Sequence, residues 1–496
     1  MHLTRSSGVL LHPTSLPGPY GVGDLGPAAH HWIEMLAETG TGVWQLLPLG
    51  PTGYGDSPYQ CFSAFAGNPL LVSPDLLVED GLLSEADLIE FPRCEEREVD
   101  YGAVIPAKLA LLDRAYRRGA RSDWSREVAA FRAEQATWIE DYSLFMALKD
   151  IHRGRPWWTW DPELRDREET TMERARGRLE DLVDSHIFRQ FLFARQWKRI
   201  RSSAAVHGIC IVGDAPIFVA EDSADVWSNR DLFQLDDIGR PTVVAGVPPD
   251  YFSATGQLWG NPLYRWDLHA ATGYRWWLDR MQAVLDLVDV VRLDHFRGFA
   301  GYWEVPAGED TAINGRWVEG PGVEFLEALT GEFGELPIIA EDLGDITPDV
   351  IELRDRFRLP GMKILQFAFD SGEENDFLPH RFPEHCVVYT GTHDNDTTRG
   401  WFDSADESDR KHALEYLGVD GSDYAWDLIE AAWKSRAAWA ITTMQDILSL
   451  GSEARMNFPS VPGGNWRWRM KQGAFTEELR TRLRSLNRET GRLSDA

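Results

Sequence analysis

The amino-acid sequence predicts an α/β fold, a (β/α)8 TIM barrel with largely helical insertions in its barrel loops. Short apolar runs alternate with amphipathic, helix-like stretches along the 496 residues, which is typical of a parallel sheet. Eight such runs can be found, and that number over this length favours a closed barrel over an open sheet. Several runs also end in an acidic residue, as strands do at the catalytic end of a barrel.

Each candidate strand is a short apolar run that leads into polar or turn-forming residues. The run GICIVGDAPIFV is an example, because its β-branched and apolar residues suit a strand buried on both faces. The run ARMNFPS is the weakest of the set. In chain order the candidate strands are 8–16, 42–50, 208–219, 290–299, 337–344, 362–370, 386–396 and 454–460.

Two segments are too long to be plain connections between a strand and a helix. The first, approximately 70–200, is charged and helix-like, and it predicts a mainly helical subdomain inserted in a barrel loop. The second, 244–267, is rich in Gly and Pro and predicts a lid loop over the mouth of the barrel. The chain, 1–496, is otherwise expected to form a single catalytic barrel.

The composition excludes several classes of partner. A net charge of −29 argues against binding to nucleic acid or to an anionic membrane surface. No stretch approaches the ~18 consecutive apolar residues of a membrane span, and the N-terminus has no signal-peptide cleavage site. The four cysteines show no pairing pattern, so we expect a cytoplasmic protein. We also expect a monomer or a weak homo-oligomer. The 21 Trp and 13 Tyr residues include candidates for platforms that bind sugar rings.

Acidic residues close five of the eight candidate strands. One such carboxylate often caps the following helix, but five on one face of a barrel indicate a reactive cleft. Paired carboxylates across a cleft suit glycoside chemistry, in which one is a nucleophile and the other a protonated acid. Arg292 shares a face of its strand with Asp294 and could keep that carboxylate ionised. The five acidic residues are Asp214, Asp294, Glu341, Asp370 and Asp394.

Other chemistries find little support in the sequence. Gly21, Gly23 and Gly26 have dinucleotide-binding spacing, but prolines separate them from their strand and the next strand ends without an acidic residue. No H-x-H, H-E-x-x-H or G-x-S-x-G motif occurs, which disfavours a metal-dependent or serine hydrolase. We therefore expect neither a cofactor nor a metal. A non-catalytic glucan-binding protein is the alternative outside the enzymes. Such a protein would retain the aromatic residues and lack at least one of the catalytic carboxylates.

Several motifs resemble those of a known family. VVRLDHFRGF, IIAEDLG and YTGTHDNDT resemble the fourth, fifth and seventh strand motifs of the α-amylase clan. More narrowly, the chain is similar to the amylomaltases, which are 4-α-glucanotransferases. The stretches that carry this similarity are GVLLHPTSLPGPYGVGDLG, LPLGPTGYGDSPYQ, GDAPIFVAEDSADVW, GVPPDYFSATGQLWGNPLY and RMNFP…GNWRWR. The similarity extends over all eight candidate strands and the lid. One departure is Ser460, where the family commonly has Gly.

The resemblance implies a retaining transfer of α-1,4-glucan segments between malto-oligosaccharides or amylose, with cyclic glucans as a further product. It implies that Asp294 is the nucleophile, Glu341 the general acid/base and Asp394 the carboxylate that fixes the substrate. A lid that shields the glycosyl-enzyme from water would favour transfer. An α-1,4-glucan hydrolase on the same machinery is the alternative. The implied substrate contacts are Arg292, His295, His393, Ser57, Tyr59, Tyr54, Asp214, Tyr251, Phe252, Trp259, Asp370 and Asn465.

Overall fold

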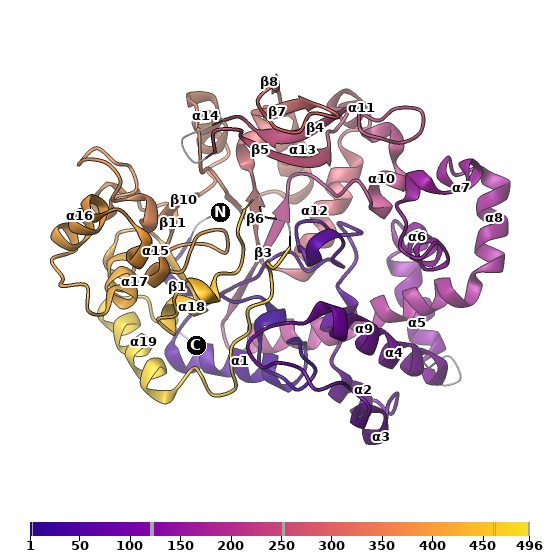
Figure 1. Cartoon of the computed structure of the whole chain (residues 1–496), viewed down its shortest axis with the longest axis horizontal. Coiled ribbons are helices and arrows are strands. Elements are labelled where there is room, and N and C mark those ends of the chain that lie inside the picture. The colour runs from indigo at the N-terminus through magenta and orange to yellow at the C-terminus, as the bar shows by residue number, and fades with distance from the viewer. Residues whose placement is uncertain (2, 120–123, 250–252, 460, 462, 495–496) are drawn as a thin grey trace.

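Eight parallel strands form the centre of the molecule (Figure 1). The computed structural model describes residues 1, 3–119, 124–249, 253–459, 461 and 463–494. The strands follow the order β10-β11-β12-β1-β2-β3-β6-β9 around the sheet. They are β1 (Ser6–Leu10), β2 (Val43–Gln45), β3 (Cys210–Pro216), β6 (Val290–Asp294), β9 (Ile338–Ala340), β10 (Gly361–Ile364), β11 (Cys386–Tyr389) and β12 (Trp439–Thr443).

The sheet curls into a barrel, because its two end strands meet. The backbone N–H of Ala340, on β9, donates to the carbonyl oxygen of Pro360, directly before β10, at 2.9 Å. The strands are almost entirely buried, as expected of a parallel sheet covered on both faces. Close packing requires Gly8 on β1, since a Cβ there would lie 2.9 Å from the Cβ of Val43. The predicted TIM barrel is therefore confirmed.

The eighth strand is not the one that the sequence predicts. Seven of the candidate runs contain or overlap an observed strand, but 454–460 does not. The eighth strand is β12, which pairs with β1 on one side and with β11 on the other. No Gly or Pro separates β12 from the helix before it, so the run WAITT merges with a helical pattern in the sequence. The segment from Arg455 instead forms a loop on the catalytic face.

Helices surround the barrel and fill its longer connections (Figure 1). Those between β2 and β3 are α2 (Pro74–Glu79), α3 (Glu85–Ile89), α4 (Tyr101–Gly119), α5 (Ser125–Glu134), α6 (Ile139–Ile151), α7 (Pro162–Arg165), α8 (Glu169–Arg178) and α9 (Glu180–Val206). The others are α1 (Pro27–Thr39), α10 (Ala224–Ser228), α11 (Trp266–Ala271), α12 (Arg275–Leu287), α13 (Gly322–Phe333), α14 (Pro348–Arg356), α15 (Thr398–Ser404), α16 (Glu407–Leu417), α17 (Tyr424–Lys434), α18 (Met444–Ile447) and α19 (Glu477–Glu489). Figure 1 shows α4 to α9 gathered on one side of the barrel and α15 to α19 on the other.

A second, antiparallel sheet lies beside the mouth of the barrel, with strand order β5-β4-β7-β8 (Figure 1). Its strands are β4 (Val243–Val247), β5 (Gln257–Pro262), β7 (Gly301–Pro306) and β8 (Arg316–Glu319). Much of the predicted lid loop is therefore the hairpin β4–β5. The sequence does not predict this sheet, because the hairpin pairs with β7, far along the chain, through contacts that only the folded structure makes.

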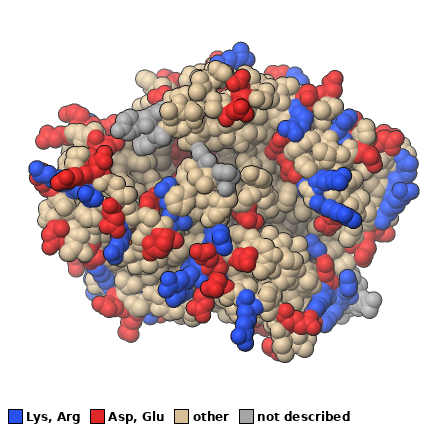
Figure 2. Space-filling model, viewed as in Figure 1, with Lys and Arg blue, Asp and Glu red and all other residues tan. Residues whose placement is uncertain are grey.

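The distribution of surface charge and the state of the cysteines agree with what the sequence predicts. Figure 2 shows acidic and basic side chains mixed over the visible face, without an extended basic area. No helix in the described part of the chain combines the length and apolarity that crossing a bilayer requires. Cys61, Cys94, Cys210 and Cys386 are all free thiols.

Candidate active site

The strand register brings the candidate residues to one end of the barrel. On β3 and β6, Asp214 lies opposite Arg292, and Pro216 lies opposite Asp294. Asp294 is the last residue of β6, and Glu341 directly follows β9, the next strand around the sheet. Asp394 belongs to the loop after β11. The carboxyl groups therefore reach the mouth of the barrel from separate strands, as in TIM-barrel active sites.

Arg292 joins two carboxylates through a single nitrogen. Its Nη1 lies 2.6 Å from Asp214 Oδ2 and 2.9 Å from Asp294 Oδ1. The hydroxyl of Tyr59 donates to the same oxygen of Asp214 at 2.9 Å. The side chain of Asp214 is inaccessible to solvent, whereas that of Asp294 is 25% exposed. Burial raises the pKa of Asp294 to about 6, and Arg292 opposes that rise.

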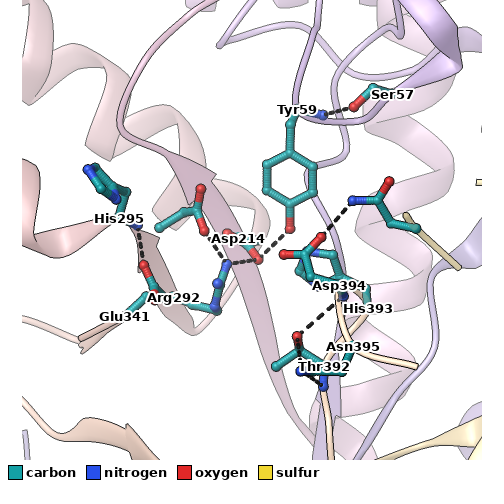
Figure 3. Close-up of polar contacts among 12 residues, drawn as sticks. Ser57, Tyr59, Asp214, Arg292, His295, Glu341, Thr392, His393, Asp394 and Asn395 are labelled. Carbon is teal, nitrogen blue, oxygen red and sulfur yellow. Dashed lines mark hydrogen bonds and ion pairs between the residues drawn. The ribbon is translucent and has the colours of Figure 1, made fainter. Parts of the chain in front are cut away.

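Glu341 is buried and held by two backbone donors, of which Figure 3 shows the one from His295. The N–H of His295 donates to Oε2 at 2.7 Å, and the N–H of Leu343 donates to Oε1 at 3.1 Å. Burial raises the pKa of Glu341 to about 8, since it outweighs Arg292 and since Asp294 adds repulsion. At pH 7 the arrangement therefore favours an ionised Asp294 beside a protonated Glu341, which are the charge states that a nucleophile and a general acid need.

Asp394 is held ionised by its neighbours. Asn457 Nδ2 donates to Oδ1 at 2.7 Å, and His393 Nε2 lies 3.2 Å from Oδ2. Arg455 Nη2 donates to the backbone carbonyl of Asp394 at 2.7 Å. Burial acts to raise the pKa of Asp394, but His393, Asn457 and Arg292 outweigh it and hold the pKa well below its usual value.

Sequence reasoning missed Asn457 and Arg455. Both lie in the run ARMNFPS, which the sequence predicts as a strand, so no sequence-based prediction places their side chains in the site. The resemblance of that run to the family's motifs was the signal that could have identified them. Their hydrogen bonds to Asp394 tie the loop of 455–466 to the loop after β11.

Aromatic rings lie close to the candidate residues, and Figure 3 shows one of them, Tyr59, with its hydroxyl pointing at Asp214. The ring of Tyr59 stacks on His393, with centroids 5.2 Å apart and planes at 17°, and Trp466 packs against both. On the other side, Trp259 of β5 meets His295 edge to face at 4.8 Å. Burial, with a smaller effect of Arg297, lowers the pKa of His295 to about 3, so its imidazole is neutral.

The remaining predicted contacts lie in several settings. Tyr54 is 79% exposed, and Ser57 Oγ accepts a hydrogen bond from the N–H of Tyr59. Asp370 is exposed beyond the end of β10 and accepts hydrogen bonds from Ser371 and Asn375.

Asn465 closes the loop of 455–466 upon itself. Its Oδ1 accepts from the N–H of Phe458 at 3.0 Å, and its Nδ2 donates to the carbonyl of Val461 at 2.9 Å. Tyr251 and Phe252 lie outside the described residues. Across the part of the chain that is described, no group of three or more His, Cys, Asp and Glu residues is arranged to hold a metal ion.

A TIM barrel with carboxylates at the ends of separate strands, beside stacked aromatic rings, defines a class of barrel enzymes suited to glycosidic bonds. Residues 11–476 match the family described as 4-alpha-glucanotransferase. The chain is 52% identical to a 4-alpha-glucanotransferase of Thermus thermophilus, over 99% of this chain and 100% of the relative. It is 49% identical to that of Synechocystis, over 98% of each chain.

A solved structure is similar over the same length. The amylomaltase of Streptococcus agalactiae, in complex with acarbose, superposes with a TM-score of 0.96 at 37% identity. The match covers 98% of this chain and 99% of that one. The chain therefore belongs to the 4-alpha-glucanotransferase family, and it has the activity of that family.

Proposed function

We propose that the enzyme transfers α-1,4-glucan segments with retention, through a covalent ester between the donor sugar and Asp294. The observation that carries the proposal is the position of Asp294, which is partly exposed at the end of β6 and paired with Arg292 at 2.9 Å. An ion pair of this kind stabilises the carboxylate form that a nucleophile needs. Glu341, protonated and directly after the neighbouring strand β9, supports the role of general acid.

In the first step, Asp294 attacks the anomeric carbon of the donor while the bond from that carbon to the glycosidic oxygen breaks. The proton of Glu341 moves to that oxygen, and the shorter glucan leaves with a free 4-hydroxyl. His295 and Leu343 place the carboxyl of Glu341 through their N–H groups, so the acid points in one direction before the substrate arrives.

In the second step, the 4-hydroxyl of another glucan attacks the same carbon and releases Asp294. Glu341, now ionised, takes the proton of that hydroxyl and returns to its starting state. Asp394, held ionised by His393 and Asn457, would accept hydrogen bonds from ring hydroxyls of the donor sugar. Such bonds favour the distorted ring of the transition state if they strengthen as the ring distorts.

The proposed substrates are malto-oligosaccharides and amylose, and an acceptor hydroxyl on the donor chain itself would yield a cyclic glucan. Tyr59 and Trp259 would contact sugar rings at the two sides of the carboxylates. Glucan hydrolysis is the competing outcome, in which water replaces the acceptor. The aromatic rings beside the carboxylates favour transfer, since they limit the entry of water.

Incubation with pure maltotriose separates these outcomes. We expect a ladder of longer and shorter oligosaccharides with a constant total of reducing ends. A steady rise in reducing ends without longer products would make the enzyme a hydrolase.

The covalent ester has its own test. Glu341→Gln, mixed with α-maltotriosyl fluoride, should accumulate a glycosylated peptide that contains Asp294 in mass spectra. Asp294→Asn is the control and should show no adduct. An adduct on another residue in either variant would refute the assignment of Asp294 as the nucleophile.

A further inference from the structure

Three consecutive residues after the proposed nucleophile hold the segment that begins at Glu341. The N–H of His295 donates to Glu341 Oε2 at 2.7 Å, and the N–H of Phe296 donates to the backbone carbonyl of Glu341 at 3.1 Å. Arg297 continues the series with its side chain, since Nη1 donates to the carbonyl of Asp345 at 2.8 Å. Its Nη2 donates to Thr347 Oγ1 at 3.4 Å. The loop after β6 is therefore hydrogen-bonded to the loop after β9 at several positions along its length.

The hydrogen bond from Arg297 matters because of Leu343. Leu343 lies between Glu341 and Asp345, and its N–H donates to Glu341 Oε1 at 3.1 Å. By fixing the carbonyl of Asp345, Arg297 also restrains the backbone that carries this donor. The left-handed conformation of His295, with φ of 53°, holds the other donor to the carboxyl. Both oxygens of the carboxyl group thus depend on one pair of loops.

Arg297 is itself held by the second sheet. Its guanidinium lies 3.8 Å from the ring centroid of Trp317, on β8, and its side chain is only 9% exposed. Trp303 of β7 meets the ring of Trp317 edge to face at 5.2 Å. Trp303 Nε1 donates to the carbonyl of Ala312, which anchors the connection from β7 to β8. A planar guanidinium stacked on a fixed ring keeps both its position and its plane.

We infer that Arg297, clamped by Trp317, is a positioning residue for the acid/base Glu341. This inference rests on the role proposed for Glu341 above. The second sheet then contributes to catalysis indirectly. Its edge strand β8 holds the side chain of Arg297, and Arg297 in turn orders the loop from Glu341 to Thr347. The consequence is specific, since only steps in which Glu341 gives or takes a proton depend on the orientation of its carboxyl group.

Two assays distinguish steps that need the proton from steps that do not. Transfer between maltotriose molecules needs Glu341 as an acid and then as a base. With α-maltotriosyl fluoride as donor and azide as acceptor, fluoride leaves without a proton and azide attacks without losing one. Neither step then requires Glu341, so the ratio of the two rates measures how well the acid/base is placed.

Arg297→Lys and Trp317→Ala are the test variants. Lysine keeps the charge but loses the planar fork that binds Asp345 and stacks on the ring. We expect Arg297→Lys to lower kcat for maltotriose by about 10- to 100-fold, as a displacement near 1 Å does, and to change the fluoride–azide rate by less than about 3-fold. Trp317→Ala should change the ratio in the same direction by a smaller factor.

Two further variants frame the result. Trp158→Ala is the matched control, because Trp158 also stacks under an arginine, Arg240, at 4.7 Å. It should leave both rates unchanged. Glu341→Ala sets the limit, with transfer abolished and the fluoride–azide rate retained. If that rate is also lost, the role proposed for Glu341 fails, and that failure is distinct from a failure of Arg297.

Two results would overturn the inference while Glu341→Ala behaves as expected. One is an equal fall in both rates, which indicates general damage to the site, and the other is an unchanged rate with maltotriose. Circular dichroism melting shows whether each variant is folded. If Arg297→Lys does not fold, Trp317→Ala and Thr347→Val decide the question, because Thr347→Val removes the 3.4 Å hydrogen bond to the guanidinium while Arg297 and both N–H donors to Glu341 remain.

Discussion

Arg292 Nη1 lies 2.9 Å from Asp294 Oδ1, inside a barrel that removes both groups from most of the surrounding water. Burial raises the pKa of Asp294, and the positive charge of Arg292 opposes that rise. The arginine therefore favours the ionised form of the Asp294 carboxyl group. The same nitrogen lies 2.6 Å from Asp214, so one cation serves two anions. Four residues on two adjacent strands and one loop, with Tyr59 included, thus form a single electrostatic unit.

Arg292→Gln should raise the pKa of Asp294, because the buried Asp214 and the partly exposed Asp294 would lose their common cation. We expect the acidic limb of the pH profile of kcat/KM to move upward and the free energy of unfolding to fall by about 3–5 kcal/mol. Arg292→Lys, which keeps a charge, should move the limb less. An acidic limb at the wild-type pH in Arg292→Gln would contradict the proposed role of the ion pair.

The pH profile of kcat/KM should be bell-shaped. Activity should rise with pH through about 6, as Asp294 with its raised pKa loses its proton and becomes a nucleophile. It should fall through about 8, as Glu341 loses the proton that the leaving oxygen needs. Rates from maltotriose between pH 4 and 10 test both limbs.

The basic limb can be assigned with a donor that needs no acid. With α-maltotriosyl fluoride as donor and azide as acceptor, the basic limb of the pH profile should disappear, because the proton of Glu341 is no longer required. Persistence of that limb would assign it to a group other than Glu341.

Asn457→Ala should weaken the binding of the donor sugar in the transition state. Asn457 donates to Asp394 at 2.7 Å, and a hydrogen bond to a charged group contributes about 1.5–3 kcal/mol. We therefore expect kcat/KM for maltotriose to fall by roughly 10- to 100-fold. Asn314→Ala is the matched control, since Asn314 donates to a surface carboxylate, Glu309, at 2.8 Å. If the two variants retain equal activity, Asn457 does not orient Asp394.

The sequence predicts the part of the site that lies on strands. Arg292 and Asp294 share a face because side chains alternate along a strand, and their run is apolar enough to be recognised. Glu341 directly follows a similar run. The barrel fold could be predicted for the same reason, since seven of the eight apolar runs contain or overlap its strands.

The parts that escaped prediction depend on tertiary contacts. WAITT reads as the continuation of a helix, and only its pairing with β1 and β11 makes it β12. Asn457 comes from a loop, so no periodicity links it to Asp394. Arg297 reads as one more charge after β6, and its partner Trp317 lies on an edge strand that has no regular alternation in the sequence. Residues that orient catalytic groups from loops therefore need the folded structure to be found.

Trp259→Ala should raise the ratio of hydrolysis to transfer. The ring of Trp259 is half-buried on β5, packs edge to face on His295 at 4.8 Å and lies 6.4 Å from Phe218. Its removal would open a path for water to the sugar held on Asp294, and water then competes with the acceptor. Chromatography of maltotriose products, with total reducing ends counted in parallel, measures the ratio directly. Trp259→Phe should keep most of the shielding, and Trp158→Ala, which removes a ring stacked under Arg240, should leave the ratio unchanged. An unaltered ratio in Trp259→Ala would mean that other residues exclude water from the glycosyl-enzyme.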